Sequence, residues 1–145
     1  MERVLDKEDL AGRKRIDIII LFSTMSNKRI IKPEIHQKGW GEERWIINSE
    51  LYCGKILILK KGKRCSIHYH KIKDETFYIL IGKVEMNLYP NGYPGKVESM
   101  IMKQGDTLHI PTGLIHEFFG LEYSEILEVS TQHFEEDSHR LKNGD

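Results

Sequence analysis

From Arg44 onward the chain is a series of short β-prone segments separated by turn residues. We expect strands over residues 44–47, 54–60, 65–70, 76–81, 83–89, 97–102, 107–110, 116–119 and 124–130. Strong turn signals separate several of them, such as Pro90-Asn91-Gly92 and Pro111-Thr112-Gly113. Many short strands without a sustained helical period predict an all-β protein, an antiparallel sandwich or barrel.

The first 30 residues differ from the rest. Residues 4–15 carry acids early and bases late, which suits a short helix. Residues 16–22 are rich in β-branched side chains and predict a strand, whereas residues 23–42 look irregular. We therefore expect an N-terminal extension over residues 1–30, followed by a β-barrel domain over residues 31–145.

Charge and cysteine content narrow the classes of partner. Lysine plus arginine total 22 and so do the acids, so the formal net charge is zero. A large basic field for nucleic acid or an anionic membrane is therefore not expected, and a small molecule or another protein is the favoured partner. Two cysteines form no disulfide framework, no clear secretory signal is visible, and the apolar run 18–22 is too short to span a bilayer. These features predict a cytoplasmic protein with reduced thiols.

The strongest chemical signal lies in residues 62–82. His68 and His70 are two apart in a β-prone segment, so both imidazoles point to the same face of a strand. Glu75 follows five residues later and opens the next segment, in which Phe77, Ile79 and Ile81 share its face. The pattern predicts two imidazoles and one carboxylate inside a mostly apolar cavity.

A second segment, residues 105–120, offers a fourth ligand. His116 begins a strand directly after the turn at Pro111-Thr112-Gly113. Three neutral imidazoles and a carboxylate suit one divalent transition metal ion, namely Mn, Fe, Co, Ni or Zn. Four protein ligands leave two positions of a six-coordinate ion for water or substrate, which Lewis-acid catalysis requires. We predict His68, His70, Glu75 and His116 as the metal ligands.

These two segments resemble the two motifs of the cupin superfamily. The first is similar to G-x5-HxH-x4-E-x6-G, with Gly62, His68, His70, Glu75 and Gly82 in place, and the second is similar to G-x5-PxG-xxH-xxxN, with Gly105, Pro111, Gly113 and His116 in place. Gly120 stands where the second motif has asparagine, a departure that concerns a loop contact. The resemblance covers residues 38–133 and implies a jelly-roll barrel, the double-stranded β-helix, with the metal inside one end.

A finer resemblance concerns the flanks. KGWGEERW (38–45) and ILEVSTQHFEEDSHR (126–140) are similar to segments of mannose-6-phosphate isomerase-like cupins. This likeness implies a sugar or sugar-phosphate substrate and a metal that stabilises an enediolate while a base moves a proton between two carbons. Glu75 and Glu128 are the candidate catalytic carboxylates, with Glu128 as the proton shuttle.

Further residues are candidates for substrate binding. Arg64 and Ser66 share strand parity with His68, so both are expected to face the cavity, and a guanidinium suits a phosphate or carboxylate. Lys55 and Arg140 are rival anion binders, and His109 shares parity with Thr107 and is a candidate wall residue. Alternation points Cys65 away from the metal, and the acidic run 135–137 is most simply a solvated turn.

Two other functions fit the same residues. Three histidines and a glutamate also serve mononuclear iron dioxygenases, and a non-catalytic sugar-binding or regulatory module would need no turnover at all. Tyr78 and Leu80 lie on the strand face opposite Glu75, and an apolar outer face of this kind indicates a covering segment or the partner of a homodimer.

Overall fold

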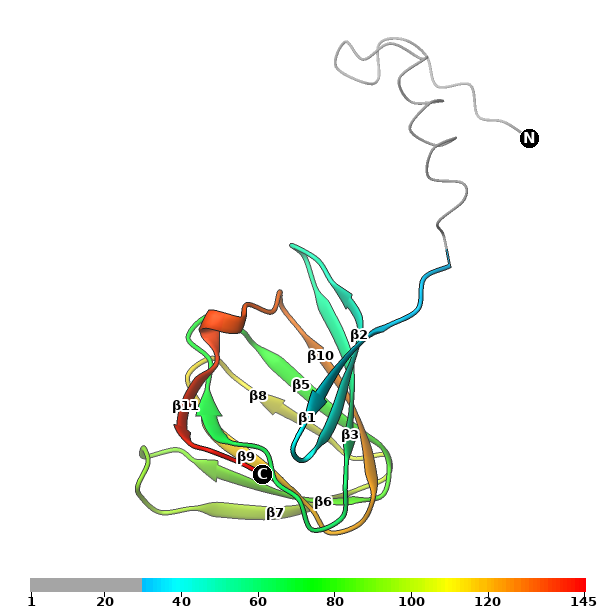
Figure 1. Ribbon diagram of the computed structural model, residues 1–145. Coiled ribbons are helices and arrows are strands. Elements are labelled where there is room, and N and C mark those ends of the chain that lie inside the picture. Colours follow the sequence, from blue (N-terminus) through cyan, green and yellow to red (C-terminus); the bar gives the residue numbers. More distant parts are fainter. Residues whose placement is uncertain (1–29) are drawn as a thin grey trace, which may run out of the picture. The chain divides into compact units, whose positions relative to one another are not determined.

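The computed structural model describes residues 30–145, and in this range the chain forms two antiparallel β-sheets (Figure 1). Sheet A contains, in spatial order, β1 (Glu34–Lys38), β2 (Gly41–Asn48), β3 (Cys53–Leu59), β10 (Ser124–Ser130), β5 (Glu75–Ile81) and β8 (Thr107–Ile110). Sheet B contains β11 (His139–Lys142), β4 (Ile67–Tyr69), β9 (Ile115–Gly120), β6 (Lys83–Tyr89) and β7 (Glu98–Lys103). Residues 33–145 form one compact unit. The expected all-β jelly roll is confirmed.

Helical structure is minor in the described part of the chain. A short 3₁₀ turn, η1 (Glu135–Asp137), is its only helical element. Over residues 30–145 no helix is long and apolar enough to cross a membrane. The helix expected over residues 4–15 and the strand expected over residues 16–22 lie outside the described residues.

The hydrophobic core fills the space between the two sheets. Alternation along β6 buries Val84, Met86 and Leu88, as the sequence predicts. Sheet A contributes its own inward residues, among them Leu57, Leu59, Phe77, Ile79 and Ile126, and Phe118 joins them from β9 of sheet B. Each such side chain contributes about 1.5–3 kcal/mol when it is fully buried. The core therefore joins the sheets over part of their inner faces, and the polar residues described below occupy another part.

Ile81 does not share the inward face of Glu75 as expected, because a β-bulge precedes it. Ile79 pairs with Ile126 and Ile81 pairs with Glu125, so a step of two residues on β5 is matched by a step of one residue on β10. Such an irregularity turns the following side chain out of register. Ile81 is consequently 48% exposed, whereas Phe77 and Ile79 line the interior as expected.

The departure from the second motif at Gly120 has a steric cause. Gly120 ends β9 and exchanges backbone hydrogen bonds with the Gly62–Lys63 turn, because its N–H donates to Lys63 and its carbonyl accepts from Gly62. A Cβ at position 120 would lie 2.6 Å from the carbonyl oxygen of Lys60. An asparagine does not fit this close approach of two backbone segments.

Candidate metal centre

The four predicted ligands come together at one end of the space between the sheets. His68 lies in β4 and pairs directly with His116 in β9, whereas His70 follows β4 and Glu75 opens β5. One ligand atom from each residue lies within 4.8 Å of the others. The antiparallel pairing of β4 with β9 explains why two segments 48 positions apart meet here.

Backbone carbonyls orient all three imidazoles. The Nδ1 atoms of His68, His70 and His116 lie 2.8, 2.9 and 2.9 Å from the carbonyl oxygens of Ser66, Asp137 and Leu114. A carbonyl only accepts, so each Nδ1 carries the proton and each Nε2 keeps its lone pair. Metal-binding histidines are commonly held in this way by a hydrogen bond on the other ring nitrogen.

Several ligand atoms have no other partner. His70 Nε2, His116 Nε2 and Glu75 Oε1 are buried and form no hydrogen bond within the described structure. His116 Nε2 lies 3.0 Å from Glu75 Oε1, and His70 Nε2 lies 3.6 Å from the same oxygen. Buried polar atoms are normally paired, and lone pairs that face one another at this distance need a cation between them. The residues therefore fit a metal ion.

Electrostatics keep His68, His70 and Glu75 in their ligating forms. Burial lowers the pKa of His68 well below its usual range, and burial together with the charge of Lys73 lowers the pKa of His70 to about 4. Burial alone would raise the pKa of Glu75, but the positive charge of Lys73 opposes burial and the net shift is downward. Neutral imidazoles and an ionised carboxylate are the forms that bind first-row divalent ions, although the donor set does not select one of them.

Lys73 is a buried residue of this site that strand parity could not reveal. Its Nζ lies 2.5 Å from Glu75 Oε2 and 2.8 Å from Glu128 Oε1, and its side chain is 4% exposed. One carboxylate oxygen of Glu75 is thus engaged by Lys73, and the other faces the histidines. Lys73 belongs to the connection between β4 and β5, where no alternation defines which way a side chain points.

Asp137 holds that connection in place. Its carboxylate accepts hydrogen bonds from the backbone N–H groups of Lys71, Ile72 and Lys73, at 2.8 to 3.1 Å. Burial opposes ionisation, but these hydrogen bonds outweigh it and lower the pKa of Asp137. Asp137 is buried, so the expectation of a solvated acidic turn is wrong for this member of the run, because η1 folds against the β4–β5 connection.

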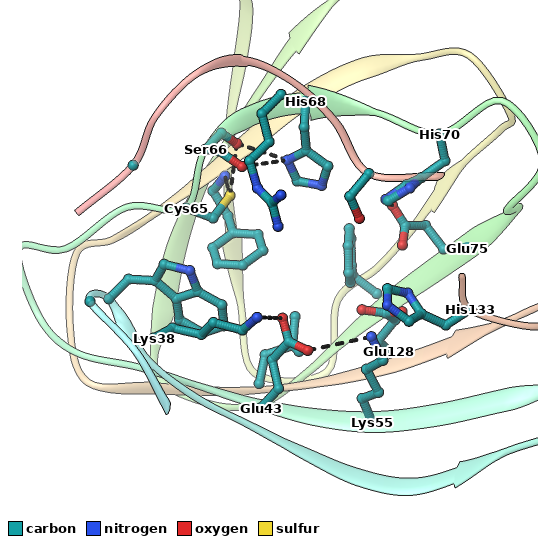
Figure 2. A pocket seen from close by; sticks show the side chains of 18 of the residues that line it. Lys38, Glu43, Lys55, Cys65, Ser66, His68, His70, Glu75, Glu128 and His133 are labelled. Atoms are coloured by element: carbon teal, nitrogen blue, oxygen red, sulfur yellow. Dashed lines mark hydrogen bonds and ion pairs between the residues drawn. The ribbon is translucent and has the colours of Figure 1, made fainter. Parts of the chain in front are cut away.

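A cavity of about 430 Å³ opens beside the cluster (Figure 2). Its apolar wall includes Trp40, Leu57, Phe77 and Phe118, and polar side chains make up the rest. The predicted residues Ser66, Lys55, Glu128 and Arg140 line it, together with His68, His70 and Glu75. Cys65 also lines it, because residue 65 precedes β4 and strand alternation does not apply there, but its thiol is not part of the four-residue cluster.

Charged side chains form a row across the inner face of sheet A. Lys55 on β3 and Glu128 on β10 are direct cross-strand partners, and Glu43 on β2 lies 3.4 Å from Lys55. Lys73 then joins Glu128 to Glu75. The row Glu43–Lys55–Glu128–Lys73–Glu75 alternates in sign and extends from the metal cluster to the opposite wall of the cavity.

Two predicted substrate-binding residues lie outside the cavity. Arg64 is exposed, pairs with Glu117 at 3.6 Å and stacks on Phe119, because it forms only an isolated bridge and residues 64–66 do not continue β4. His109 is exposed and lies 3.0 Å from Asp74. In β8 the alternation buries Ile110 instead, so His109 points to the outer face. The assignment of both residues to the cavity wall is therefore corrected.

Together the fold and the site define a two-sheet β-barrel with a candidate three-histidine, one-glutamate metal centre in its interior. The chain belongs to the cupin family, whose sequence model matches residues 51–143. No curated protein matches the sequence.

Solved structures share the fold. Oxalate decarboxylase from Bacillus subtilis superposes with a TM-score of 0.66 at 23% identity over 75% of this chain, and the chain spans 30% of the enzyme's length. A second structure of that enzyme, described for its Mn(II) centres, gives a TM-score of 0.65. KdgF from Halomonas sp. gives a TM-score of 0.61 at 15% identity, over 71% of this chain and 89% of its own. At these identities the likeness establishes the fold alone.

Proposed function

We propose that this cupin is a metal-dependent isomerase that acts on a sugar or sugar phosphate. The observation that carries the proposal is the adjacency of a buried metal-ligand cluster and a buried acid–base pair, Glu128 with Lys73, in one cavity. A bound divalent ion would supply Lewis-acid stabilisation of the negative charge on the substrate oxygens. The Mn(II) centres named for the similar oxalate decarboxylase support a metal at this position.

The protein's own groups account for the proton movement. Glu128 would take the proton from C2 of an aldose and return it to C1, while the hydroxyl proton of O2 passes to O1. Lys73 donates a hydrogen bond to Glu128 at 2.8 Å and so fixes the carboxylate. Apolar residues of the wall, such as Phe77 and Phe118, exclude water from the carbon acid during the transfer.

The flanking segments also support a sugar ligand. Lys38, Trp40 and Glu43 come from the segment similar to mannose-6-phosphate isomerase-like cupins at residues 38–45, and all three line the cavity. Glu128, His133 and Arg140 come from the second such segment and line it as well. Both segments of the finer resemblance thus contribute to the cavity wall, which supports the proposal of a sugar ligand.

The test is turnover by metal-reconstituted protein. Each of Mn, Fe, Co, Ni and Zn is supplied without oxygen, and a panel of aldoses and aldose phosphates is assayed for ketose. We expect His68→Ala to lose metal and activity, Glu128→Gln to keep metal but lose activity, and the exposed-site control His109→Ala to keep both. Absence of ketose with every metal would refute the isomerase.

The dioxygenase alternative rests on the same donor set, since three histidines and a glutamate also suit ferrous iron. Oxygen consumption that requires Fe(II) would favour it over isomerisation. A ligand that copurifies tightly, with no turnover under either condition, would instead support a binding or regulatory module.

We also propose a homodimer that forms through the outer face of sheet A. Tyr78 on β5 and Val129 on β10 lie on neighbouring strands, and they are 38% and 51% exposed. Light scattering should give a dimer for the native chain and a monomer for Tyr78→Glu. Ile101→Glu on sheet B, where Ile101 is 65% exposed, is the control that should remain dimeric. A cytoplasmic location is proposed as well, because Cys53 and Cys65 are both free thiols.

A further inference from the structure

The wall of the cavity formed by β2 and β3 carries a second group of polar residues that the metal cluster does not use. Glu43 comes from β2, Lys55 from β3, and His133 from the segment that follows β10. In Figure 2 Glu43 and Lys55 lie across the cavity from His68. All three residues line the cavity, and we call them the distal subsite.

His133 brings an unpaired acceptor to this subsite. Its side chain is 7% exposed, and its Nδ1 is buried without a hydrogen-bond partner among the described residues. Its Nε2 lies 3.3 Å from Glu135 Oε2, so Nε2 carries the proton that is donated to that carboxylate. Burial, with the charges of Lys55 and Lys73, lowers the pKa of His133 and keeps the ring neutral. Nδ1 is therefore available to accept a hydrogen bond from a donor on a ligand.

The ionic groups of the distal subsite already have partners within the protein. The carboxylate of Glu43 lies 3.5 Å from the Nζ of Lys38 and 3.4 Å from the Nζ of Lys55, and it accepts a hydrogen bond from the indole N–H of Trp45 at 2.8 Å. The Nζ of Lys55 also lies 4.2 Å from the centre of the Trp45 ring, and its side chain is only 2% exposed. Arg140, the remaining cation considered for anion binding, lies 3.4 Å from Glu135.

A terminal phosphate would find these surroundings unfavourable. It offers acceptor oxygens to the acceptor Nδ1 of His133 and a second negative charge to the carboxylate of Glu43. A hydroxyl group both donates and accepts, so it satisfies His133 or Glu43 as acceptors and Lys55 as a donor. Counting Lys38 with the charged row, three ammonium groups, those of Lys38, Lys55 and Lys73, match in number the three carboxylates of Glu43, Glu128 and Glu75, so these six cavity-lining groups carry no net charge.

We propose that the distal subsite binds hydroxyl groups at the end of the substrate remote from the metal, so that the ligand is a free, polyhydroxylated sugar and not a sugar phosphate. This inference rests on the proposed function for the reaction, but it concerns recognition, which is measured separately. It assigns Glu43 and His133 to the selection of substrate.

The experiment measures binding to Mn-loaded protein by calorimetry. The probes are D-mannose with D-mannose 6-phosphate and D-ribose with D-ribose 5-phosphate. A buried polar group left unpaired costs about 1–3 kcal/mol, so at least one free aldose should bind about tenfold or more tighter than its phosphate. Glu43→Gln should narrow that ratio by about tenfold, because an amide still pairs with a hydroxyl but no longer repels phosphate.

Two further variants separate recognition from folding. His133→Phe keeps the ring but removes the acceptor, and it should weaken binding of the free aldose about tenfold with little effect on the phosphate. Glu42→Gln is the matched control, because Glu42 contacts Arg44 and Gln37 and does not line the cavity. Metal content and melting temperature are recorded for each variant.

The inference would be overturned if the phosphates bound as tightly as the free aldoses, or if no probe bound at tens of millimolar. It would also be overturned if the ratio of free-aldose affinity to phosphate affinity were unchanged in folded Glu43→Gln and His133→Phe. Binding of free aldoses without ketose would leave the subsite assignment intact and reject the isomerase. Ketose formed preferentially from a sugar phosphate would support the isomerase and reject the assignment of the distal subsite to free sugars.

Discussion

At the scale of single residues, Lys73 fixes the orientation of the Glu75 carboxylate. A lysine in an apolar interior would normally lose its proton, yet Glu128 and Glu75 outweigh the effect of burial and raise the pKa of Lys73. The ammonium group engages one oxygen of Glu75 and leaves the other facing His70 and His116. Lys73 therefore positions Glu75, a candidate metal ligand.

Replacement of Lys73 by methionine tests that role. We expect metal affinity to fall about 10- to 100-fold, as is usual when a partner of a metal ligand is lost. Competition with a chelator of known affinity measures the change. Lys71→Met is the control, because Lys71 is exposed and only its backbone N–H contributes to the structure of the connection. Equal affinity of Lys73→Met and Lys71→Met would contradict the assignment.

Glu43 makes the stability of the fold depend on pH, in a direction that its pKa shift determines. Burial raises its pKa, but Lys55, the Trp45 indole and Lys38 outweigh burial, and the net pKa is lowered. A group with a lowered pKa in the folded state stabilises the fold above its unfolded pKa, about 4.3, and the stabilisation disappears as the pH falls through the lower folded value.

Urea unfolding across pH measures this contribution. At pH 7 we expect Glu43→Gln to be less stable than the native chain by about 1–2 kcal/mol. Below about pH 4 the difference should begin to shrink, because the unfolded carboxylate takes up a proton before the folded one does, and it should vanish once both states are protonated. A difference that is constant from pH 7 to pH 3 would show that the ion pairs of Glu43 do not stabilise the fold.

Strand parity correctly predicted that His68 and Glu75 would face the same interior, and it failed where no strand exists. His68 lies in β4 and Glu75 opens β5, so alternation holds for both. Arg64 precedes β4 in an irregular segment and points away from the cavity, toward Glu117. Lys73 lies in a connection whose conformation depends on Asp137, a residue 64 positions later. Such long-range contacts leave no periodic signal in the sequence.

At the scale of elements, two motif glycines that look equivalent in sequence have different surroundings. Gly62 and Gly82 have φ values of 76° and 89°, a region that costs a residue with a Cβ about 1 kcal/mol or more. At Gly62 an added Cβ would meet nothing within 4 Å. At Gly82, between β5 and β6, it would lie 2.2 Å from the carbonyl oxygen of Tyr123.

Alanine substitutions should therefore separate backbone strain from steric clash. Gly62→Ala should cost about 1–2 kcal/mol from backbone strain alone. Gly82→Ala carries the same strain and also forces β10 away from the β5–β6 turn, so it should cost at least about 3 kcal/mol. Denaturant unfolding of the two variants gives the comparison, and equal costs would show that the close approach at Gly82 relaxes freely.

The strands themselves were predicted unequally. β6, β8 and β10 begin and end at the residues that alternation and turn signals indicate. β1 and β11 were not expected, because EIHQK and HRLK lack an alternating apolar pattern. Each edge strand forms through its partner: β1 pairs with β2 across a tight turn, and β11 pairs with β4. Tertiary pairing, and not local propensity, defines these two strands.

On the scale of the whole molecule, the four cluster residues and the core residues that the structure describes share one compact unit, residues 33–145. The division of the chain near residue 30 stays a proposal. Metal binding at the cluster would be linked to folding, because the four candidate ligands come from three strands and one connection that converge only in the native state.

A fragment of residues 33–145 should therefore fold and bind metal as the full chain does. A ligand that binds only the folded state at 100 times its dissociation constant adds about 2.7 kcal/mol, so manganese or zinc should raise the melting temperature of both proteins equally. His116→Ala should abolish the rise in both, because it removes a fully buried ligand, whereas His109→Ala should preserve it. Scanning calorimetry with and without metal measures these shifts. A fragment that melts without cooperativity would show that residues 1–32 contribute to the barrel, and a metal-induced rise that persists in His116→Ala would place the ion at other residues.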